Sequence, residues 1–309
     1  MSNKDITFLG TSAQQPTRDR NHCAILVRWN EEGLLFDPGE GTQRQFIFAN
    51  ISPPTVTRMF ISHFHGDHCL GLGSMLMRLN LDKVKHPIHC YYPAAFKKNF
   101  DALRYGCVYH EIIKVVEHPV KKDGVVEDGR PEKENDKSSF TIKAAFLQHG
   151  IANIGWRIEE PDRIKFKKEL LKKYKIEGPL VKQLEKEKQI KIDGKVVKLE
   201  EVSFVKKGQV LAVILDSKRC DAMLELAKDA DVVISESTFL EEKAELAEKY
   251  LHMTAKGAAE VAKEAGAKLL ILTHFSARYR DAKVFAEEAA TVFPNTIAAE
   301  DFKRVNFPV

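Results

Sequence analysis

FISHFHGDHCL, at residues 60–70, concentrates three histidines and one aspartate within six positions. Side chains two residues apart in an extended chain project to the same side, so His63 and His65 can share one cation. The glycine that follows lets the backbone turn and aims Asp67 and His68 at a second position. Imidazole nitrogen and carboxylate oxygen are ligands that divalent zinc accepts. The pattern predicts a metal site, although four unrelated surface side chains are the alternative interpretation.

The bulk properties are those of a chain that builds an ordinary hydrophobic core. Its 309 residues suffice for one large domain or two modest ones. The N-terminal MSNKDITFLG lacks the apolar segment of a signal peptide, and no window approaches the about 18 apolar residues of a membrane span. The five cysteines are scattered without a CxxC pair, which favours reduced thiols. We therefore expect a cytoplasmic protein with no membrane partner, and we expect Cys69 to be a packing residue.

Basic residues gather in one segment of the chain. Residues 163–198 hold 13 Lys plus Arg against 5 Asp plus Glu, and because the whole chain is +4, the remainder is −4. EGPL at residues 177–180 is expected to break this segment into two shorter pieces. Such a segment predicts contacts with phosphate groups, and a solvated pair of charged helices is the alternative. Its aromatic content is low (Phe166 and Tyr174), which favours recognition of RNA backbone and shape over base stacking.

Short apolar runs rich in β-branched residues predict strands, and amphipathic runs between them predict helices. The expected strands are residues 5–10, 24–29, 34–37, 58–62, 140–147, 210–216, 231–235 and 268–274. The expected helices include residues 41–49, 219–230 and 254–267. Their alternation in the C-terminal half indicates layered α/β packing. Residues 119–139 are polar and rich in turn formers, so we expect a solvated loop there.

Four more candidate ligands stand where expected strands end. They are Asp37, His149, Asp216 and His274. Each one alone is more often a turn or capping residue than a ligand. Together with the histidine-rich loop they supply seven ligands and one supporting carboxylate, which suits two neighbouring metal ions.

These residues carry a family resemblance. The H-x-H-x-D-H run after an apolar strand, with further Asp and His residues at later strand ends, resembles the metallo-β-lactamase superfamily. Within it, the chain is most similar to the ribonuclease Z family of tRNA 3′-processing endoribonucleases. PTRDRN at residues 16–21 resembles the family's P-x-K-x-R-N loop, with Arg18 in the place of the lysine.

Further motifs extend the resemblance from about residue 5 to residue 280. SEST at residues 235–238 resembles an H-E-A-T motif, HMT at residues 252–254 resembles H-S-T, and LTHFSARY surrounds His274. The basic segment with its Gly-Pro resembles the family's flexible arm, or exosite. Two departures from the family motifs stand out. Leu215-Asp216-Ser217 replaces the usual G-D-T, and serines take the first and third positions of the H-E-A-T motif. They keep the candidate ligand, so we expect them to affect only local orientation around it.

The resemblance implies a fold and a set of site residues. The fold would be α/β, a metallo-β-lactamase-type αβ/βα four-layer sandwich forming a single domain over residues 1–309, with a protruding flexible arm inserted at about 160–200. One zinc ion would be held by His63, His65 and His149, and the other by Asp67, His68 and His274, with Asp216 bridging both. Asp37 would fix a histidine tautomer through its N–H. The implied catalytic residues are Asp67, His252 and Glu236, and the implied substrate-binding residues are Pro16, Arg18, Arg20, Asn21, Gly178 and Pro179.

The activity implied is that of a zinc-dependent endoribonuclease that removes the 3′ trailer from tRNA precursors. Cleavage would leave a 3′-hydroxyl on the tRNA and a 5′-phosphate on the trailer. His252, oriented by Glu236, would protonate the leaving oxygen. The cofactor would be two Zn²⁺ per chain, with Mn²⁺ or Co²⁺ as alternatives, and the protein would be a homodimer in which each arm serves the partner's site.

Other functions on the same scaffold stay open at this point. Another phosphodiesterase, or a hydrolase of small esters or thioesters, would share the metal loop but has no need of the basic segment or PTRDRN. A di-iron redox relative would be expected to replace a histidine of the H-x-H-x-D-H run with glutamate, and all three histidines stand. A non-catalytic RNA-binding module would be expected to have lost ligands, and none is missing.

Overall fold

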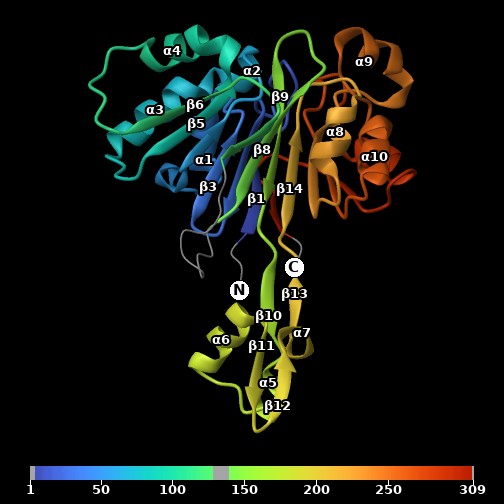
Figure 1. The fold of residues 1–309 in the computed structure, drawn as a ribbon. Coiled ribbons are helices and arrows are strands. Elements are labelled where there is room, and N and C mark those ends of the chain that lie inside the picture. The colour runs from blue at the N-terminus through green and yellow to red at the C-terminus, as the bar shows by residue number, and fades with distance from the viewer. Residues whose placement is uncertain (1–3, 128–138, 308–309) are drawn as a thin grey trace. The chain divides into compact units, whose positions relative to one another are not determined.

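The larger of two compact units holds two seven-stranded sheets packed face to face (Figure 1). This computed structural model describes residues 4–127 and 139–307. The larger unit spans residues 1–159 and 210–309, and the smaller spans residues 160–209. None of the helices in the described residues is long and apolar enough to cross a membrane.

The first sheet has the strand order β18-β1-β2-β3-β4-β5-β6. Its strands are β18 (Arg304–Asn306), β1 (Lys4–Gly10), β2 (Ala24–Trp29), β3 (Glu32–Phe36), β4 (Arg58–Phe60), β5 (Ile88–Pro93) and β6 (Val115–Val120). On its outer side lie α1 (Thr42–Phe48), α3 (Gly71–Leu81) and α4 (Lys97–Tyr105), together with the 3₁₀ turns η1 (Pro53–Thr55) and η2 (Ala94–Phe96) (Figure 1). Strands β3 to β6 run parallel to one another.

The second sheet has the order β17-β16-β15-β14-β9-β8-β7. Its strands are β17 (Thr296–Ala298), β16 (Leu270–Thr273), β15 (Val232–Glu236), β14 (Val210–Ile214), β9 (Asn153–Glu159), β8 (Thr141–Leu147) and β7 (Gly124–Glu127). Its helices are α8 (Asp221–Ala227), α9 (Ala244–Tyr250), α10 (Ala255–Glu264) and α11 (Lys283–Ala290), with η3 (Glu241–Lys243) before α9. The four-layer αβ/βα sandwich expected from the resemblance is therefore present.

Each central strand is buried on both faces, which explains why the strands read as continuous apolar runs. In β14, Leu211 and Val213 face the core between the sheets, whereas Ala212 and Ile214 face the core under the helices. Strand β2 divides in the same way between the inter-sheet core and the core beneath α1 and α3. Successive side chains of a strand point to opposite faces, so one short run feeds two cores.

The smaller unit is a miniature fold with its own core. Strand β10 (Arg163–Phe166) pairs antiparallel with β13 (Ser203–Lys206), and β11 (Gln189–Ile192) forms a hairpin with β12 (Lys195–Lys198). Helices α5 (Lys168–Lys173), α6 (Pro179–Glu187) and α7 (Leu199–Val202) complete it. Leu184 and Val202 are fully buried at its centre. Gly178 has φ +56°, and Pro179 starts α6 where its missing N–H is harmless, so the predicted break at EGPL is confirmed.

One expectation about local structure is corrected, and one hairpin was not foreseen. Residues 119–139 were expected to form a solvated loop, but Val120 ends β6 and is buried, and residues 124–127 form the edge strand β7. Tertiary pairing with β8 organises this polar stretch, while residues 128–138 lie outside the described residues. The hairpin at residues 189–198 was not foreseen, because the Lys-rich sequence around it is compatible with a helix. In the structure, Asp193 and Gly194 both have positive φ and form the turn of the hairpin.

Candidate metal centre

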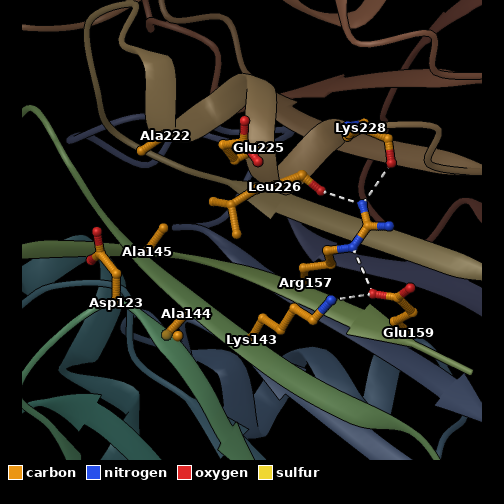
Figure 2. Close-up of a pocket in the computed structure, with 11 residues that line it drawn as sticks. Asp123, Lys143, Ala144, Ala145, Arg157, Glu159, Ala222, Glu225, Leu226 and Lys228 are labelled. Carbon is orange, nitrogen blue, oxygen red and sulfur yellow. Dashed lines mark hydrogen bonds and ion pairs between the residues drawn. The ribbon is translucent and has the colours of Figure 1, made fainter.

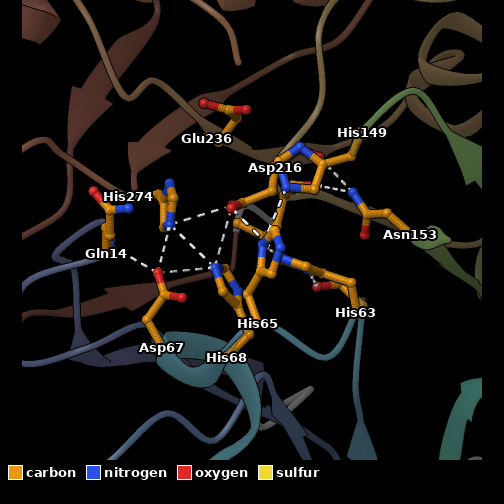
Figure 3. A network of polar contacts seen from close by, with 12 residues as sticks. Gln14, His63, His65, Asp67, His68, His149, Asn153, Asp216, Glu236 and His274 are labelled. Carbon is orange, nitrogen blue, oxygen red and sulfur yellow. Dashed lines mark hydrogen bonds and ion pairs between the residues drawn. The ribbon is translucent and has the colours of Figure 1, made fainter. Parts of the chain in front are cut away.

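The candidate ligands converge because they follow strands that point the same way. Strands β3 and β4 are parallel, as are β14, β15 and β16. Strand β8 also points with β14, since each is antiparallel to β9. The side chains that follow the carboxyl ends of these strands therefore converge, as Figure 3 shows for Asp67, His149, Asp216 and His274. α2 (Gly66–Cys69) follows β4 there and carries two of the ligands.

A first group of ligand atoms gathers around His65. Its Nδ1 lies 3.0 Å from His63 Nε2 and 3.2 Å from His149 Nε2. Asp216 Oδ2 lies 3.6 Å from His63 Nε2. One ligand atom from each of these four residues lies within 4.8 Å of the others, a spacing that one cation can span.

A second group lies on the other side of Asp216. His68 Nε2 and His274 Nε2 are 3.1 Å apart, and Asp67 Oδ2 lies 3.4 Å and 3.5 Å from them. Asp216 contacts this group too, with Oδ2 at 3.3 Å from His68 Nε2 and Oδ1 at 3.2 Å from His274 Nε2. Asp216 is therefore placed between the two groups, as a bridging carboxylate would be (Figure 3).

Hydrogen bonds outside the two groups set the histidine tautomers. Asp37 Oδ2 lies 2.7 Å from His68 Nδ1. Ser62 donates its hydroxyl proton to Asp37, so its oxygen accepts from His63 Nδ1 at 2.9 Å. Thr238 likewise donates to Glu236 and accepts from His274 Nδ1 at 3.0 Å. Each of these imidazoles thus has its Nδ1 proton held by an outer partner, which turns Nε2 inward toward the other ligands.

This arrangement fits divalent metal ions. Inward lone pairs and carboxylate oxygens repel one another unless a cation lies between them. Asp216 Oδ1 is buried and has no hydrogen-bond partner among the described residues, which is costly for a carboxylate without a counter-charge. Cys69 is buried and donates its thiol proton to the His65 carbonyl, which supports its expected packing role. The donor set of imidazole and carboxylate groups matches zinc, manganese or cobalt.

The charges of the centre are strongly coupled. Burial raises the pKa of Asp67, but His68 and His274 outweigh it and hold this pKa well below its usual range. Burial and neighbouring histidines lower the pKa of His63, which favours the neutral form that binds metal. Burial likewise opposes charge at His68, yet Asp216 and Asp67 raise its pKa well above the ordinary value.

Three of the strand-end residues have left-handed backbone conformations. Asp37, Asp216 and His274 have φ of +45°, +44° and +60°. Such values are uncommon in residues other than glycine and persist where surrounding contacts hold them. Asn153, fully buried, donates from Nδ2 to the carbonyls of Leu215 and Asp216 and holds the turn at the bridging position.

The departures from the family motifs make local hydrogen bonds. Ser217 Oγ accepts from Gln148 N at 3.0 Å, directly before His149, and its backbone N–H donates to Glu236 Oε1 at 2.7 Å. Ser237 Oγ donates to the Thr273 carbonyl at 3.2 Å, directly before His274. These serines therefore tie the loops of the centre together without occupying ligand positions.

Buried Glu236 pairs with half-buried His252 beside the centre. His252 Nδ1 lies 2.9 Å from Glu236 Oε1. Burial lowers the pKa of His252, but the charge and hydrogen bond of Glu236 outweigh it and raise this pKa to about 9. The His252 ring centroid lies 5.3 Å from that of His149 and 5.7 Å from that of His274. The His252 ring thus stands next to both ligand groups, and Glu236 favours its protonated form.

The PTRDRN loop is attached to the centre through its backbone. Gln14 N donates to Asp67 Oδ2 at 2.7 Å, just before the loop begins. Pro16 and Arg18 are exposed, whereas Arg20 is buried and donates from Nη2 to the carbonyls of Ser276 and Tyr279. Gly178 and Pro179 belong to the smaller unit instead.

Sequence reasoning missed several residues that hold the site. Ser62, Thr238 and Asn153 orient ligands, and the first two stand inside the FISH and SEST motifs that point to the site. Asp301 accepts from Asn21 N at 2.7 Å and from Thr11 Oγ1 at 2.7 Å, which anchors the end of the PTRDRN loop. Burial raises the pKa of Asp301 to about 6. Asp301 lies 280 residues after Asn21 in the chain, so no local sequence pattern reveals that it anchors this loop.

A pocket of about 370 Å³ lies elsewhere, between β8, β9 and α8 (Figure 2). Three of its charged groups interact: Arg157 donates to the carbonyls of Leu226 and Lys228 and to Glu159, which also pairs with Lys143. The lining contains none of the candidate site residues. The Arg157 guanidinium caps the carboxyl end of α8, which is a structural role.

Comparisons with known proteins agree with this geometry. The chain is 59% identical over 309 residues to ribonuclease Z of Protochlamydia amoebophila, covering 100% of this chain and 97% of the relative. It is 57% identical over 308 residues to ribonuclease Z of Chlamydia muridarum, covering 100% and 99%. The family model described as Anti-Pycsar protein Apyc1 matches residues 4–121.

Solved structures show the same architecture. The crystal structure of human tRNase Z, short form, matches with TM-score 0.68 and 25% identity, covering 99% of this chain and 100% of that one. The metallo-β-lactamase-fold protein YhfI of Bacillus subtilis matches with TM-score 0.66 and 19% identity, covering 98% of both chains, and supports the fold alone. The family predicted from the motifs is thus confirmed. The chain belongs to the ribonuclease Z family, the metal-dependent endoribonucleases of tRNA 3′ processing within the metallo-β-lactamase superfamily.

Proposed function

We propose that this chain removes the 3′ trailer from tRNA precursors with two zinc ions, leaving a 3′-hydroxyl on the tRNA and a 5′-phosphate on the trailer. The observation that carries the proposal is the pair of ligand groups joined by Asp216, in a chain 59% identical to a ribonuclease Z over its full length. The alternative, hydrolysis of a small ester or thioester, does not account for the basic smaller unit.

We assign the ligands by the two groups. His63, His65 and His149 would hold one ion, Asp67, His68 and His274 would hold the other, and Asp216 lies between the two groups. When bound, such ions lower the pKa of water to about 7 and offset the negative charge of the phosphodiester. The chain itself keeps the ligands in place, since Asp37 holds His68 and hydroxyl groups hold His63 and His274.

We assign His252 as the general acid. Glu236 is fully buried and binds Nδ1 of His252, which leaves the proton on Nε2 free to move to the leaving 5′-oxygen. A ribose oxygen leaves poorly as an anion, so a proton delivered in the transition state speeds cleavage by roughly 10²–10⁴-fold. Glu236 is a positioning residue that also keeps the imidazole protonated. Asp67 completes the catalytic set through its place among the ligands.

We propose that the smaller unit is the exosite arm that binds tRNA. Residues 163–198 carry a local charge of +8. The lysine side chains contact phosphates of the RNA backbone, and these contacts weaken as the salt concentration rises. Gly178 and Pro179 stand at the start of α6, where the exposed loop reaches the RNA. In the larger unit, Pro16, Arg18, Arg20 and Asn21 are proposed to receive the RNA end, and Arg18 is exposed and offers a positive charge to a phosphate.

A homodimer completes the proposal. Large apolar side chains are exposed on the helices that cover the first sheet, including Ile47 (64%), Phe48 (54%) and Leu81 (73%). Exposed apolar groups of this size on neighbouring helices are typical of a protein interface. We place the enzyme in the cytoplasm, where its five free cysteines remain reduced.

The test is cleavage of a 5′-labelled tRNA precursor with a 3′ extension, together with elemental analysis of the purified enzyme. We expect one cut near the discriminator base, a 3′-hydroxyl on the tRNA and two zinc ions per chain. An enzyme that leaves the precursor intact but hydrolyses a small thioester would contradict the proposed substrate. One ion per chain in the fully active enzyme would contradict the dinuclear assignment.

A further inference from the structure

A second cluster of histidines lies away from the metal centre, where the edge strands of the two sheets meet. His89 is on β5 and His118 is on β6, the edge strand of the first sheet. Glu127 ends β7, the edge strand of the second sheet. Tyr91 pairs with His118 across the strands and stacks on it with ring centroids 4.3 Å apart, so these side chains share the face that looks toward the other sheet.

The nitrogen spacing in this cluster matches that of the metal centre. His89 Nδ1 and His118 Nε2 are 2.9 Å apart, compared with 3.0 Å, 3.1 Å and 3.2 Å for the facing histidine nitrogens of the metal centre. One ligand atom each of His89, His118 and Glu127 lies within 4.8 Å of the others. Two nitrogens bound to one tetrahedral zinc are about 3.3 Å apart, so a shift of a few tenths of an ångström admits the ion.

The surroundings orient the carboxylate of Glu127. Arg58 Nη2 donates to Glu127 Oε1 at 2.8 Å, and Tyr91 donates to Oε2. Ligating carboxylates are commonly held by such outer hydrogen bonds. Arg58 also pairs with Glu32, so two carboxylates face one guanidinium. Burial lowers the pKa of both histidines, which favours neutral imidazoles.

We propose that His89, His118 and Glu127 form a further cation site that takes a zinc-like divalent ion and joins the two sheets at their edge strands. Both imidazoles come from the first sheet and the carboxylate comes from the second. A bound ion therefore opposes separation of β6 from β7, and it stabilises the folded chain by mass action. The site lies outside the catalytic groups, so its role is in stability.

The experiment measures zinc binding by the zinc-loaded full chain. A double variant, His89→Gln with His118→Phe, removes both imidazoles while keeping an aromatic ring against Tyr91. The matched control is His110→Gln, because His110 is an exposed histidine outside the cluster. Equilibrium dialysis over a range of free zinc gives the number of ions per chain, and thermal melts at the same concentrations give the effect on stability.

We expect wild type and His110→Gln to bind one more zinc per chain than the double variant and to melt at higher temperature as zinc rises. Zinc-binding curves and melting temperatures that coincide in all three proteins would overturn the proposal and leave a plain hydrogen-bonded histidine pair. If the double variant does not fold, His89→Gln alone gives the same comparison with the His118–Tyr91 stack intact. Cleavage of tRNA precursors should be equal in all three, so the outcome does not depend on the proposed function.

Discussion

Replacing Glu236 with glutamine should make RNA cleavage sensitive to pH on the alkaline side. Burial lowers the pKa of His252, but Glu236 outweighs it and raises this pKa from the usual 6.5 to about 9, so wild type keeps the proposed general acid protonated through neutral pH. Glutamine has the same shape and can still accept the Ser217 N–H, but it removes the charge that raises the pKa. The pKa of His252 then falls, and the alkaline limb of the pH–rate profile moves to lower pH.

The size of the effect follows from the two pKa values. At pH 8, roughly nine-tenths of His252 is protonated with a pKa of about 9, but only roughly one-thirtieth with the usual 6.5. Cleavage by Glu236→Gln should therefore fall ~30-fold at pH 8 and by less than about twofold at pH 6, if protonation alone limits the rate.

The assay is single-turnover cleavage of a 3′-extended tRNA precursor between pH 6 and pH 9, alongside hydrolysis of bis(p-nitrophenyl) phosphate. The nitrophenolate leaves readily as an anion, so its release should lose much less rate. Glu248→Gln is the matched control, because Glu248 is an exposed carboxylate paired with Lys218 and does not contact His252. A uniform loss at every pH, or an equal loss on both substrates, would refute the general-acid assignment.

Three further changes test the ligands and the smaller unit. His65→Ala should abolish cleavage and lower bound zinc, because one group loses a ligand; elemental analysis that finds wild-type zinc and normal turnover would sink the dinuclear assignment. Asp37→Ala should reduce zinc affinity or activity on the order of 10–100-fold, as loss of a ligand's hydrogen-bond partner does, measured by competition with a chelator. Replacing residues 163–206 with a short Gly-Ser bridge should leave the larger unit folded, because Asp162 and Lys207, which form an ion pair, flank the deleted segment. The affinity for tRNA should fall and depend less on salt, because the phosphate contacts are lost. Filter binding at several salt concentrations decides this, and unchanged affinity would mean that the segment is only a solvated surface.

Local chemistry made the strands and the first ligands predictable from sequence. Strand β2 coincides with the expected run at residues 24–29, because double-sided burial selects continuous β-branched and apolar residues. His63, His65, Asp67 and His68 stand within six positions, so their spacing alone indicates metal binding. These features depend on neighbours in the chain, and a linear sequence displays them directly.

Only the tertiary structure decided how distant residues meet. Ser62, Asn153 and Thr238 act through hydrogen bonds to ligands that topology brings beside them, and serine, asparagine and threonine are too common to be recognised by type. Strand β7 and the hairpin at residues 189–198 likewise depend on pairing partners that polar sequence does not reveal. The convergence of Asp37, His149, Asp216 and His274 needs the parallel direction of their strands, and that direction is set by the crossovers between strands and by packing of both sheets around one core.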